Sequence, residues 1–240
     1  MLALALVLIA TTTGSGTSKT EKRPLEAFTS VSTLGSFTVD IVKGDALGAE
    51  VTADDNIVPL VVTEVKDGVL TITGKDGESF NSKIAVVVKV TAKSLDAVSA
   101  SGSGRTSVTD VPASAKSIAL ASSGSGALAW KGAANNVTVK GSGSGTVTLI
   151  GKGAALDAAL SGSGALDASA FEVAAAKVAV TGSGHAQVNA TDELHASVTG
   201  AGRILYAGSP RVIKRISGSG DIEAKDAPAP IEKKRASSGW

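Results

Sequence analysis

The sequence has no cysteine, few aromatic residues and few charges, and each shortage excludes a class of function. Without cysteine there are no disulfides, thiolate nucleophiles, zinc–thiolate sites or lipid-modified N-terminal cysteine. Aromatic residues make up 3% of the 240 residues, so stacking platforms for bases or sugars are scarce. The net charge of +1 argues against a nucleic-acid binder held by a basic surface.

Long apolar runs are also missing. The longest N-terminal run, Leu2 to Ala10, has nine residues, whereas a membrane-spanning helix needs about 20. Small and polar residues follow it, as in a secretory signal and its cleavage zone. We therefore expect a signal-peptide-like segment over 1–16 and a linker over 17–27. The mature chain would begin within 11–20, be exported and have no transmembrane span. The alternative is that the apolar run forms a buried first strand.

What the sequence has in abundance is glycine, with 28 residues against 6 prolines, and much of it lies in one repeated motif. The motif is small-Gly-small-Gly, and its first glycines are separated by 22, 19, 19, 20, 18 and 18 residues. Such a near-fixed period fits one coil of a β-solenoid and is too short for helical-hairpin repeats. The motif glycines are Gly102, Gly104, Gly124, Gly126, Gly143, Gly145, Gly162, Gly164, Gly182, Gly184, Gly200, Gly202, Gly218 and Gly220.

Apolar and polar residues alternate on both sides of the motif. Two and four residues after the second glycine the residues are mostly apolar, as at Val147 and Leu149, with a mostly polar position between them. Before the motif, Val137 and Val139 alternate in the same way. A period of two predicts strands with one buried face, so each coil should consist of strand, corner, strand and loop. Glycine suits the corner because it tolerates a positive φ and close backbone approach.

Two segments conflict with this pattern. Ala165 to Val180 is rich in alanine, which locally favours a helix, but its repeat register favours strands and we expect strands. Lys214 occupies a column that is otherwise small or apolar. Either a bulge shifts residues 211–215, or the last complete coil is a polar cap.

The first half of the chain has β periodicity without a repeat, and turn signals separate its alternating segments. The alternating segments are residues 37–42, 49–53, 59–65, 69–73 and 84–90. We expect an N-terminal β region over 28–94, continuous with a repeat region over 95–225, and an extended tail over 226–240. The predicted fold class is all-β: a β-solenoid of about seven glycine-cornered coils, preceded by an irregular, hairpin-rich cap.

Several of these segments resemble a known family. Phe28 and Val31, Phe37-Thr38-Val39, Val69-Leu70-Thr71-Ile72 and the repeated SGSG corners are similar to the auto-transporter adhesin, head GIN domain family. The resemblance runs from about Phe28 to Lys225. It implies a right-handed, single-stranded β-helix in a bacterial envelope or secreted protein, and it brings no established activity and no catalytic residues.

The glycines do not form a nucleotide-binding loop. Residues 141–145 lack the G-x-G-x-x-G spacing and precede a strand, and Lys152 lacks the surroundings of a P-loop. The sequence Asp54-Asp55-Asn56 predicts a turn, with a weak cation site as the alternative. Trp130 and Tyr206 fall on inward columns, which favours core packing over ligand stacking. We therefore expect no cofactor, no metal and no catalytic residues.

Two outward stripes combine a histidine with charged residues on consecutive coils, roughly 5 Å apart per coil. As a functional interpretation, each stripe is an acid/base or sugar-binding groove. The alternative, which we favour, is a solvated ladder of compensating charges. The first stripe consists of Asp157, Lys177 and His195, and the second of Asp167, His185 and Arg203.

Together these features favour a non-enzymatic, exported β-helix domain that serves as an adhesion, binding or structural module of the bacterial cell envelope. Extended faces and variable loops suit contacts with a glycan, an envelope polymer or another protein, and no nucleic acid is expected. One alternative is a polysaccharide-modifying enzyme on the same scaffold. Another is an envelope signalling or assembly accessory whose solenoid ends stack into homo-oligomers.

Overall fold

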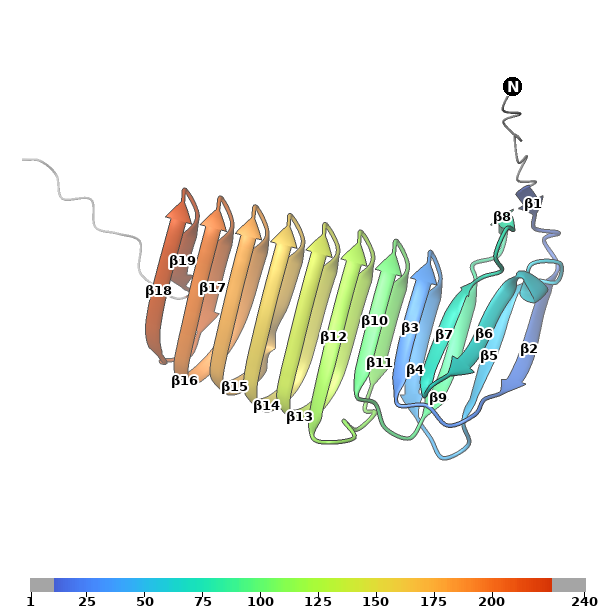
Figure 1. Cartoon of the computed structure of the whole chain (residues 1–240), viewed down its shortest axis with the longest axis horizontal. Helices are drawn as coiled ribbons and strands as arrows, with labels where there is room; N and C mark the ends of the chain where they lie inside the picture. The colour runs from blue at the N-terminus through green and yellow to red at the C-terminus, as the bar shows by residue number, and fades with distance from the viewer. Residues whose placement is uncertain (1–10, 226–240) are drawn as a thin grey trace, which may run out of the picture.

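The computed structural model describes residues 11–225, and most of them lie in β-strands stacked into one elongated body (Figure 1). Successive coils follow one another in chain order along the long axis. This arrangement confirms the predicted all-β solenoid. The apolar run over 2–10 and the predicted tail over 226–240 lie outside the described residues.

The repeat region forms the regular part of the stack, and its named strands pair in parallel. Its strands are β10 (Ala97–Gly102), β11 (Arg105–Thr109), β12 (Ser117–Gly124), β13 (Ala127–Gly143), β14 (Thr146–Gly162), β15 (Ala165–Gly182), β16 (His185–Gly200), β17 (Arg203–Ala207), β18 (Arg211–Gly218) and β19 (Asp221–Ala224). The β13 to β16 strands each run through most of one coil, because the first half pairs on one side of the solenoid and the second half on the other.

Two broad faces meet at the glycine corners. We call face A the outer surface of the strands that precede each corner, namely β10, β12, β18 and the second halves of β13 to β16. Face B is the outer surface of the strands that follow each corner, namely β11, β17, β19 and the first halves of β13 to β16. The corner glycines lie in register, since Gly124 pairs with Gly102 on one side and Gly143 on the other.

Inward-facing residues of both faces form the core. In β14, Val147 from face B and Leu156 from face A are each at most 2% exposed, while Asp157 beside them is exposed. The alanine-rich segment Ala165 to Val180 lies within β15 and keeps the same alternation. Burial of one strand face therefore outweighs the local helix propensity of its alanines, as the repeat register predicts.

The two glycines of each corner meet different constraints. The first has a positive φ in all seven copies, from +92° at Gly143 to +120° at Gly218. The second does not, but a Cβ at Gly145 would lie 2.5 Å from the carbonyl oxygen of Gly126 in the preceding coil. Backbone stacked directly on backbone therefore leaves no room for a side chain at either position.

At the opposite margin of the coils, face B passes into face A. This lower margin comprises residues 132–135, 151–154, 169–174 and 190–192, and two aromatic rings pack beneath it. Trp130 and Phe171 meet edge to face with centroids 5.6 Å apart, and both are at most 1% exposed. Trp130 therefore belongs to the core, as its inward column predicts.

The N-terminal region is an irregular β cap. Its elements are β1 (Thr11–Thr13), β2 (Ser18–Pro24), β3 (Ser30–Gly35), β4 (Thr38–Lys43), β5 (Gly48–Asp54), the 3-10 turn η1 (Val58–Leu60), β6 (Val61–Lys66), β7 (Val69–Gly74), β8 (Ser79–Asn81) and β9 (Val87–Ala92). Strands β3 and β4 pair in parallel with β10 and β11, so the cap continues directly into the repeat. By contrast, β2, β5 and β6 pair antiparallel with their neighbours.

The predicted linker over 17–27 is wrong for most of its length, because β2 pairs with the whole of β5. The strand is hard to recognise in the sequence because charged residues occupy positions where apolar residues are expected. Lys19, Glu21 and Arg23 lie opposite inward-facing residues of β5, so the inward positions of this edge strand are not apolar. Inward charges on an edge strand are a known defence against unwanted strand pairing.

The misfit at Lys214 is resolved in favour of a polar cap. The pairing of β16 with β18 runs without a shift from Glu193–Arg211 to Gly200–Gly218, so no bulge is present. Lys214 lies opposite the buried Ala196, and its side chain is exposed because β18 is the last strand of its face within the described chain.

Candidate functional site

The first predicted stripe lies on face A across three neighbouring strands. Register places Asp157 beside Lys177 and Lys177 beside His195. Lys177 Nζ lies 3.8 Å from the carboxylate of Asp157, and both side chains are more than half exposed. His195 Nε2 instead lies 3.1 Å from Oε1 of Glu193, two residues earlier on the same strand. The stripe therefore consists of a solvated ion pair beside a separate His–Glu pair.

Glu193 is the central residue of this cluster, although it was not among the sequence candidates. Arg211 of the next coil donates a hydrogen bond to the same Oε1 atom at 2.7 Å. The pKa of the Glu193 carboxyl is lowered, first by the hydrogen bond from Arg211 and then by that from His195. The sequence does contain a signal for this pair, because Arg211 follows Glu193 by 18 residues, the length of one coil.

The second predicted stripe lies on face B and is less closely connected. His185 pairs in register with Arg203, whereas Asp167 lies in the adjacent column beside Gln187. The Asp167 carboxylate accepts hydrogen bonds from the hydroxyl and the N–H of Ser169, and these bonds lower its pKa. Asp167 is therefore engaged by Ser169 of its own strand rather than by the histidine.

These clusters limit the chemistry that the surface offers. The histidines lie on open faces of the solenoid, where water reaches them freely. Across residues 11–225, no group of three or more histidine, cysteine or acidic side chains is arranged to hold a metal ion. Charge pairs on adjacent strands of this kind stabilise a sheet modestly and are screened by solvent.

The predicted turn is present one residue later, over 55–57, and the carboxylate of Asp54, the last residue of β5, is buried. Asp54 accepts hydrogen bonds from the Ser82 hydroxyl and from the N–H groups of Gly16 and Ile84, at 2.6 to 3.0 Å. Because these partners are donors from two distant segments, the carboxylate holds these segments of the cap together and is not a cation site.

The environment of Asp54 changes its ionisation. Burial raises the pKa of the carboxyl, but the hydrogen bonds from Ser82, Ile84, Gly16 and Lys83 lower it by more, so that the pKa falls to about 2. The charged form is therefore the one that the surrounding N–H and O–H groups stabilise.

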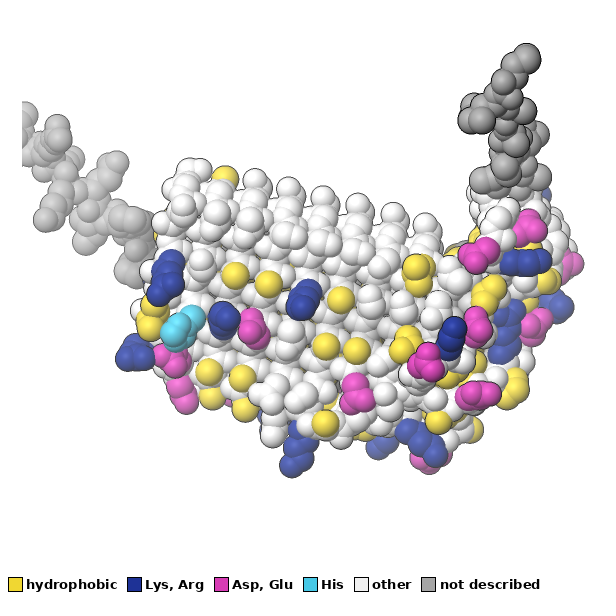
Figure 2. All heavy atoms as spheres, in the orientation of Figure 1, with side chains coloured by type: hydrophobic (Ala, Val, Ile, Leu, Met, Phe, Trp, Pro, Cys, Tyr) yellow, Lys and Arg dark blue, Asp and Glu magenta, His cyan; other side chains and the backbone are white. Residues whose placement is uncertain are grey.

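Three shallow, open grooves adjoin one another on face A and the lower margin, over β13 to β15. One of about 710 Å³ lies along the lower margin, one of about 350 Å³ contains the stripe of Asp157, Lys177 and His195, and one of about 400 Å³ lies nearer the corners. Their linings are consecutive along each strand; in β13 they are residues 133–135, 136–138 and 140–142. Together the three linings form one continuous surface, which we call the track, on the face that is turned toward the viewer in Figure 2.

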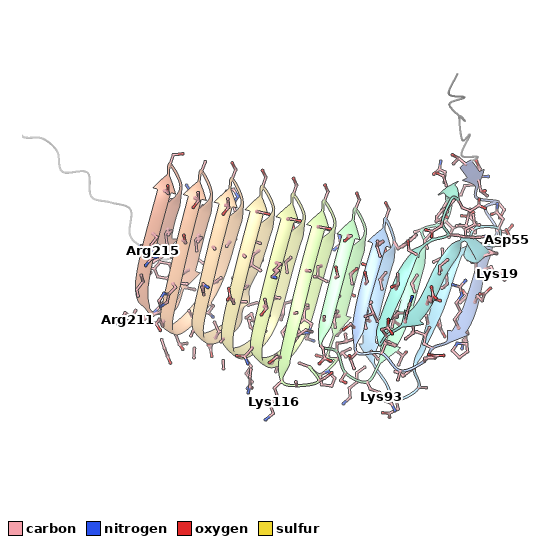
Figure 3. The ribbon with its side chains drawn as sticks, viewed as in Figure 1. Lys19, Asp55, Lys93, Lys116, Arg211 and Arg215 are labelled. Atoms are coloured by element: carbon pink, nitrogen blue, oxygen red, sulfur yellow. The ribbon has the colours of Figure 1, made fainter. Side chains whose placement is uncertain are left out.

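The track is lined mostly by small side chains, with a few lysines among them. The upper half of the face, near the corners, is almost uncharged in Figure 2, and charged groups gather lower down. Four lysines and three acids line the three grooves: Lys116, Lys140, Lys152 and Lys177, and Asp157, Glu172 and Glu193. Within residues 11–225, Lys116, Lys140 and Lys152 make no ion pair, and among the acids Glu172, which lies in register beside Lys152, makes none. Lys116 projects from the lower margin (Figure 3). The charges of the track that make no ion pair among the described residues are therefore mostly positive.

The fold and these surfaces define a β-solenoid that presents broad, open faces. Its membership is shown by the family model described as "Putative auto-transporter adhesin, head GIN domain", which matches residues 27–210. The chain belongs to this family. No curated protein sequence matches the chain.

Several solved structures share the fold. A putative adhesin from Bacteroides fragilis NCTC 9343 is 22% identical, with a TM-score of 0.78 over 88% of this chain and 99% of that one. A putative lipid binding protein from Parabacteroides distasonis ATCC 8503 is 24% identical, with a TM-score of 0.73 over 90% and 99%. A putative adhesin from the same strain is 26% identical, with a TM-score of 0.63 over 90% and 100%.

In the described part of the chain, no helix has the length and apolar character needed to cross a membrane.

Proposed function

We propose that this chain is an exported, non-enzymatic binding module of the bacterial cell envelope that engages an extended partner along face A. Its family is described by the word adhesin, as are two of the solved structures that share its fold. An adhesin needs a broad and accessible surface, and both faces of the solenoid are of that kind.

The observation that carries the proposal is the continuous track of three grooves. Each groove is open and shallow, and all three are lined by successive residues of the same strands. Enclosed sites for small molecules bury most of their ligand, whereas an open track suits a polymer that lies across several coils. The solenoid repeats its surface every coil, which matches a ligand that is itself a repeating chain.

The chemistry of the track favours an acidic polysaccharide. Lys116, Lys140 and Lys152 supply positive charge without an ion-pair partner among the described residues, so an anionic polymer would gain contacts that a neutral one lacks. Aromatic platforms for stacking neutral sugars are scarce, since the chain is 3% aromatic and Trp130 is buried. Charge, rather than ring stacking, would therefore select the partner.

A direct test compares polymers of different charge. Binding to alginate, a polyuronate, and to uncharged dextran is measured by isothermal titration calorimetry at low and high salt. We expect binding to alginate only, weakening as salt rises. Replacing Lys116, Lys140 and Lys152 together by glutamine should weaken it about tenfold, if each contact contributes on the order of 0.5 kcal/mol.

The matched control removes the same charge from face B. The triple variant Arg105→Gln, Lys131→Gln and Arg203→Gln has the same net charge and should bind alginate as the unmodified chain does. Equal loss in both variants would indicate a nonspecific charge effect and contradict the assignment to face A. Vesicles of phosphatidylglycerol serve as a further arm, because one similar structure is described as a lipid binding protein. Binding to vesicles but not to alginate would replace the polysaccharide by a membrane.

The alternative of a polysaccharide-modifying enzyme rests on one contact, the 3.1 Å pair of His195 with Glu193 beside the middle groove. A histidine held by a carboxylate can act as a general base. Measurable turnover of a polysaccharide that His195→Gln abolishes, while binding is retained, would favour the enzyme over the binding module.

A further inference from the structure

The C-terminal end of the described solenoid leaves two strands with one neighbour each. Strand β18 pairs with β16 on face A, and β19 pairs with β17 on face B. No described element lies beyond them along the axis (Figure 1). Their outer N–H and C=O groups therefore form two parallel edges, of the kind that other strands readily extend.

The core is partly open between these two edges. The inward positions of β18 align with Leu194, Ala196 and Val198, which are at most 2% exposed in the coil before. The corresponding residues of β18 are Val212, Lys214 and Ile216. Ile216 is 48% exposed, so the end of the solenoid presents apolar surface together with backbone groups that have no strand partner within residues 11–225.

One side chain crosses this opening. Lys214 Nζ donates a hydrogen bond of 2.7 Å to the carbonyl oxygen of Ile222 on β19, and lies 5.3 Å from the centroid of the Tyr206 ring. The side chain thus runs from the last strand of face A to the last strand of face B. Its ammonium occupies the place where a further coil would put an apolar residue, and burying that charge without a partner would be costly.

At the N-terminal end of the solenoid, the edge strand is protected by more inward-facing charged side chains than at the C-terminal end. Its edge strand β2 carries three inward charges, Lys19, Glu21 and Arg23, and Glu21 pairs with both neighbours. The Arg23 guanidinium also donates to the carbonyl oxygens of Val58 and Val61, across to η1 and β6. Lys19 is labelled at this end in Figure 3, and Arg211 and Arg215 at the other.

We propose that the C-terminal end is a self-association surface and that, among the described residues, Lys214 is the one that prevents association. A second copy is the partner that fits, because only an identical end presents two edges with the same separation between faces. Two such ends would meet about a two-fold axis, with β18 against β18 in antiparallel pairing. That contact would bury two Lys214 ammonium groups against each other, and the like charges and lost hydration prevent it.

The test removes the inward charge from the full chain. Sedimentation velocity over a wide range of protein concentration should show a monomer for the unmodified chain. Lys214→Val should show a concentration-dependent doubling of the mean mass. Growth should stop at the dimer, because the inward charges of β2 block the opposite end; filaments from Lys214→Val would contradict that part of the proposal.

Two variants isolate the inward position from the loss of charge. Arg215→Val removes a cation from the same edge strand but on its outer side, next to Lys214. Lys19→Val removes an inward cation at the N-terminal end, where Glu21 and Arg23 remain. Both should stay monomeric. Association of either variant to the same extent as Lys214→Val would overturn the role given to Lys214.

A folded, monomeric Lys214→Val would also overturn the proposal, as would an unmodified chain that dimerises through β18. If Lys214→Val does not fold, Lys214→Met keeps most of the aliphatic stem and should dimerise in its place. Hydrogen exchange on the unmodified monomer supplies an independent measurement. Outward-pointing amides of β18 should exchange rapidly and those of β16 slowly, and slow exchange along β18 would mean that something other than Lys214 covers the edge.

Discussion

In the repeat region each coil is held by the backbone of the coils beside it, whereas in the N-terminal cap individual polar side chains tie distant segments together. A Cβ at Gly143 would meet the carbonyl oxygen of Gly124 at 2.5 Å, so adjacent corners are in backbone contact. In the cap, Asp54 joins residues 14–17 to residues 82–84, and Arg23 joins β2 to η1 and β6.

The two regions differ in which residues determine their structure. In the repeat, the structure is determined by the spacing of glycines and by the alternation of small apolar residues, which recur in every coil. In the cap, it is determined by single carboxylates and guanidinium groups that each have several hydrogen-bond partners. We therefore expect the repeat to be sensitive to added bulk at the corners, and the cap to be sensitive to the loss of particular charges.

The largest effect should come from Gly143→Ala in a repeat corner. Gly143 has φ +92°, which costs an alanine about 1 kcal/mol, and the added Cβ would also be forced against the backbone of the coil before it. We expect a total loss of about 3 kcal/mol, seen as a lower midpoint of urea unfolding followed by circular dichroism.

A control in the cap separates conformation from crowding. Gly68 has a comparable φ of +75°, but nothing lies within 4 Å of the position that a Cβ would take. Gly68→Ala should therefore cost only about 1 kcal/mol. Equal losses at Gly143 and Gly68 would mean that backbone crowding between coils does not govern the corners.

An intermediate effect is expected from Asp54→Asn in the cap. The amide group would present its own N–H donors to the donors that now surround the carboxylate, so the melting temperature should fall. The control Asp55→Asn changes the neighbouring exposed residue, whose carboxylate accepts one hydrogen bond from Ser15, and should change the melting temperature less.

The same residue predicts a pH dependence. The pKa of Asp54 is lowered from its ordinary value of 3.8 to about 2, so its ionised form stabilises the fold above pH 3.8. That contribution is lost as the pH falls from 3.8 toward 2. As the pH falls through this range, the melting temperature should decline more steeply for the unmodified chain than for Asp54→Asn. Parallel declines would show that the Asp54 carboxylate does not stabilise the cap.

Much of the repeat could be predicted from the sequence because its constraint recurs. One corner would be ambiguous, but seven corners in register identify both strands of each coil and the inward column that contains Trp130. The same register singled out Lys214 as a misfit. Its hydrogen bond to Ile222 could not be foreseen, because the two residues meet across the end of the solenoid and not along a column.

The cap and the charge cluster were harder to predict from the sequence, for physical reasons. Strand β2 was missed because an edge strand with inward charges has no apolar alternation, and only its partner β5 identifies it. The role of Asp54 was missed because its donors come from Gly16 and from residues 82–84, far away in the sequence. Glu193 on face A was missed because a single pair, unlike the recurring corners, gives no repeated signal: Glu193 and Arg211 are opposite each other only in the register of β16 with β18.

The smallest effect is expected for the exposed ion pair of Asp157 and Lys177 in the repeat, which can be compared with the pair of Glu21 and Arg23 in the cap. Lys177 and Asp157 are 71% and 60% exposed and 3.8 Å apart, so a double-mutant cycle with alanine should give a coupling of about 0.2 to 0.5 kcal/mol. In the cap, Arg23 is 17% exposed and meets Glu21 at 2.8 Å, so the same cycle should give about 1 kcal/mol. Both couplings are measured by urea unfolding. A coupling for Asp157 and Lys177 as large as that for Glu21 and Arg23 would contradict the interpretation of the stripe as a solvated ladder and would favour a site in which these charges are held for a ligand.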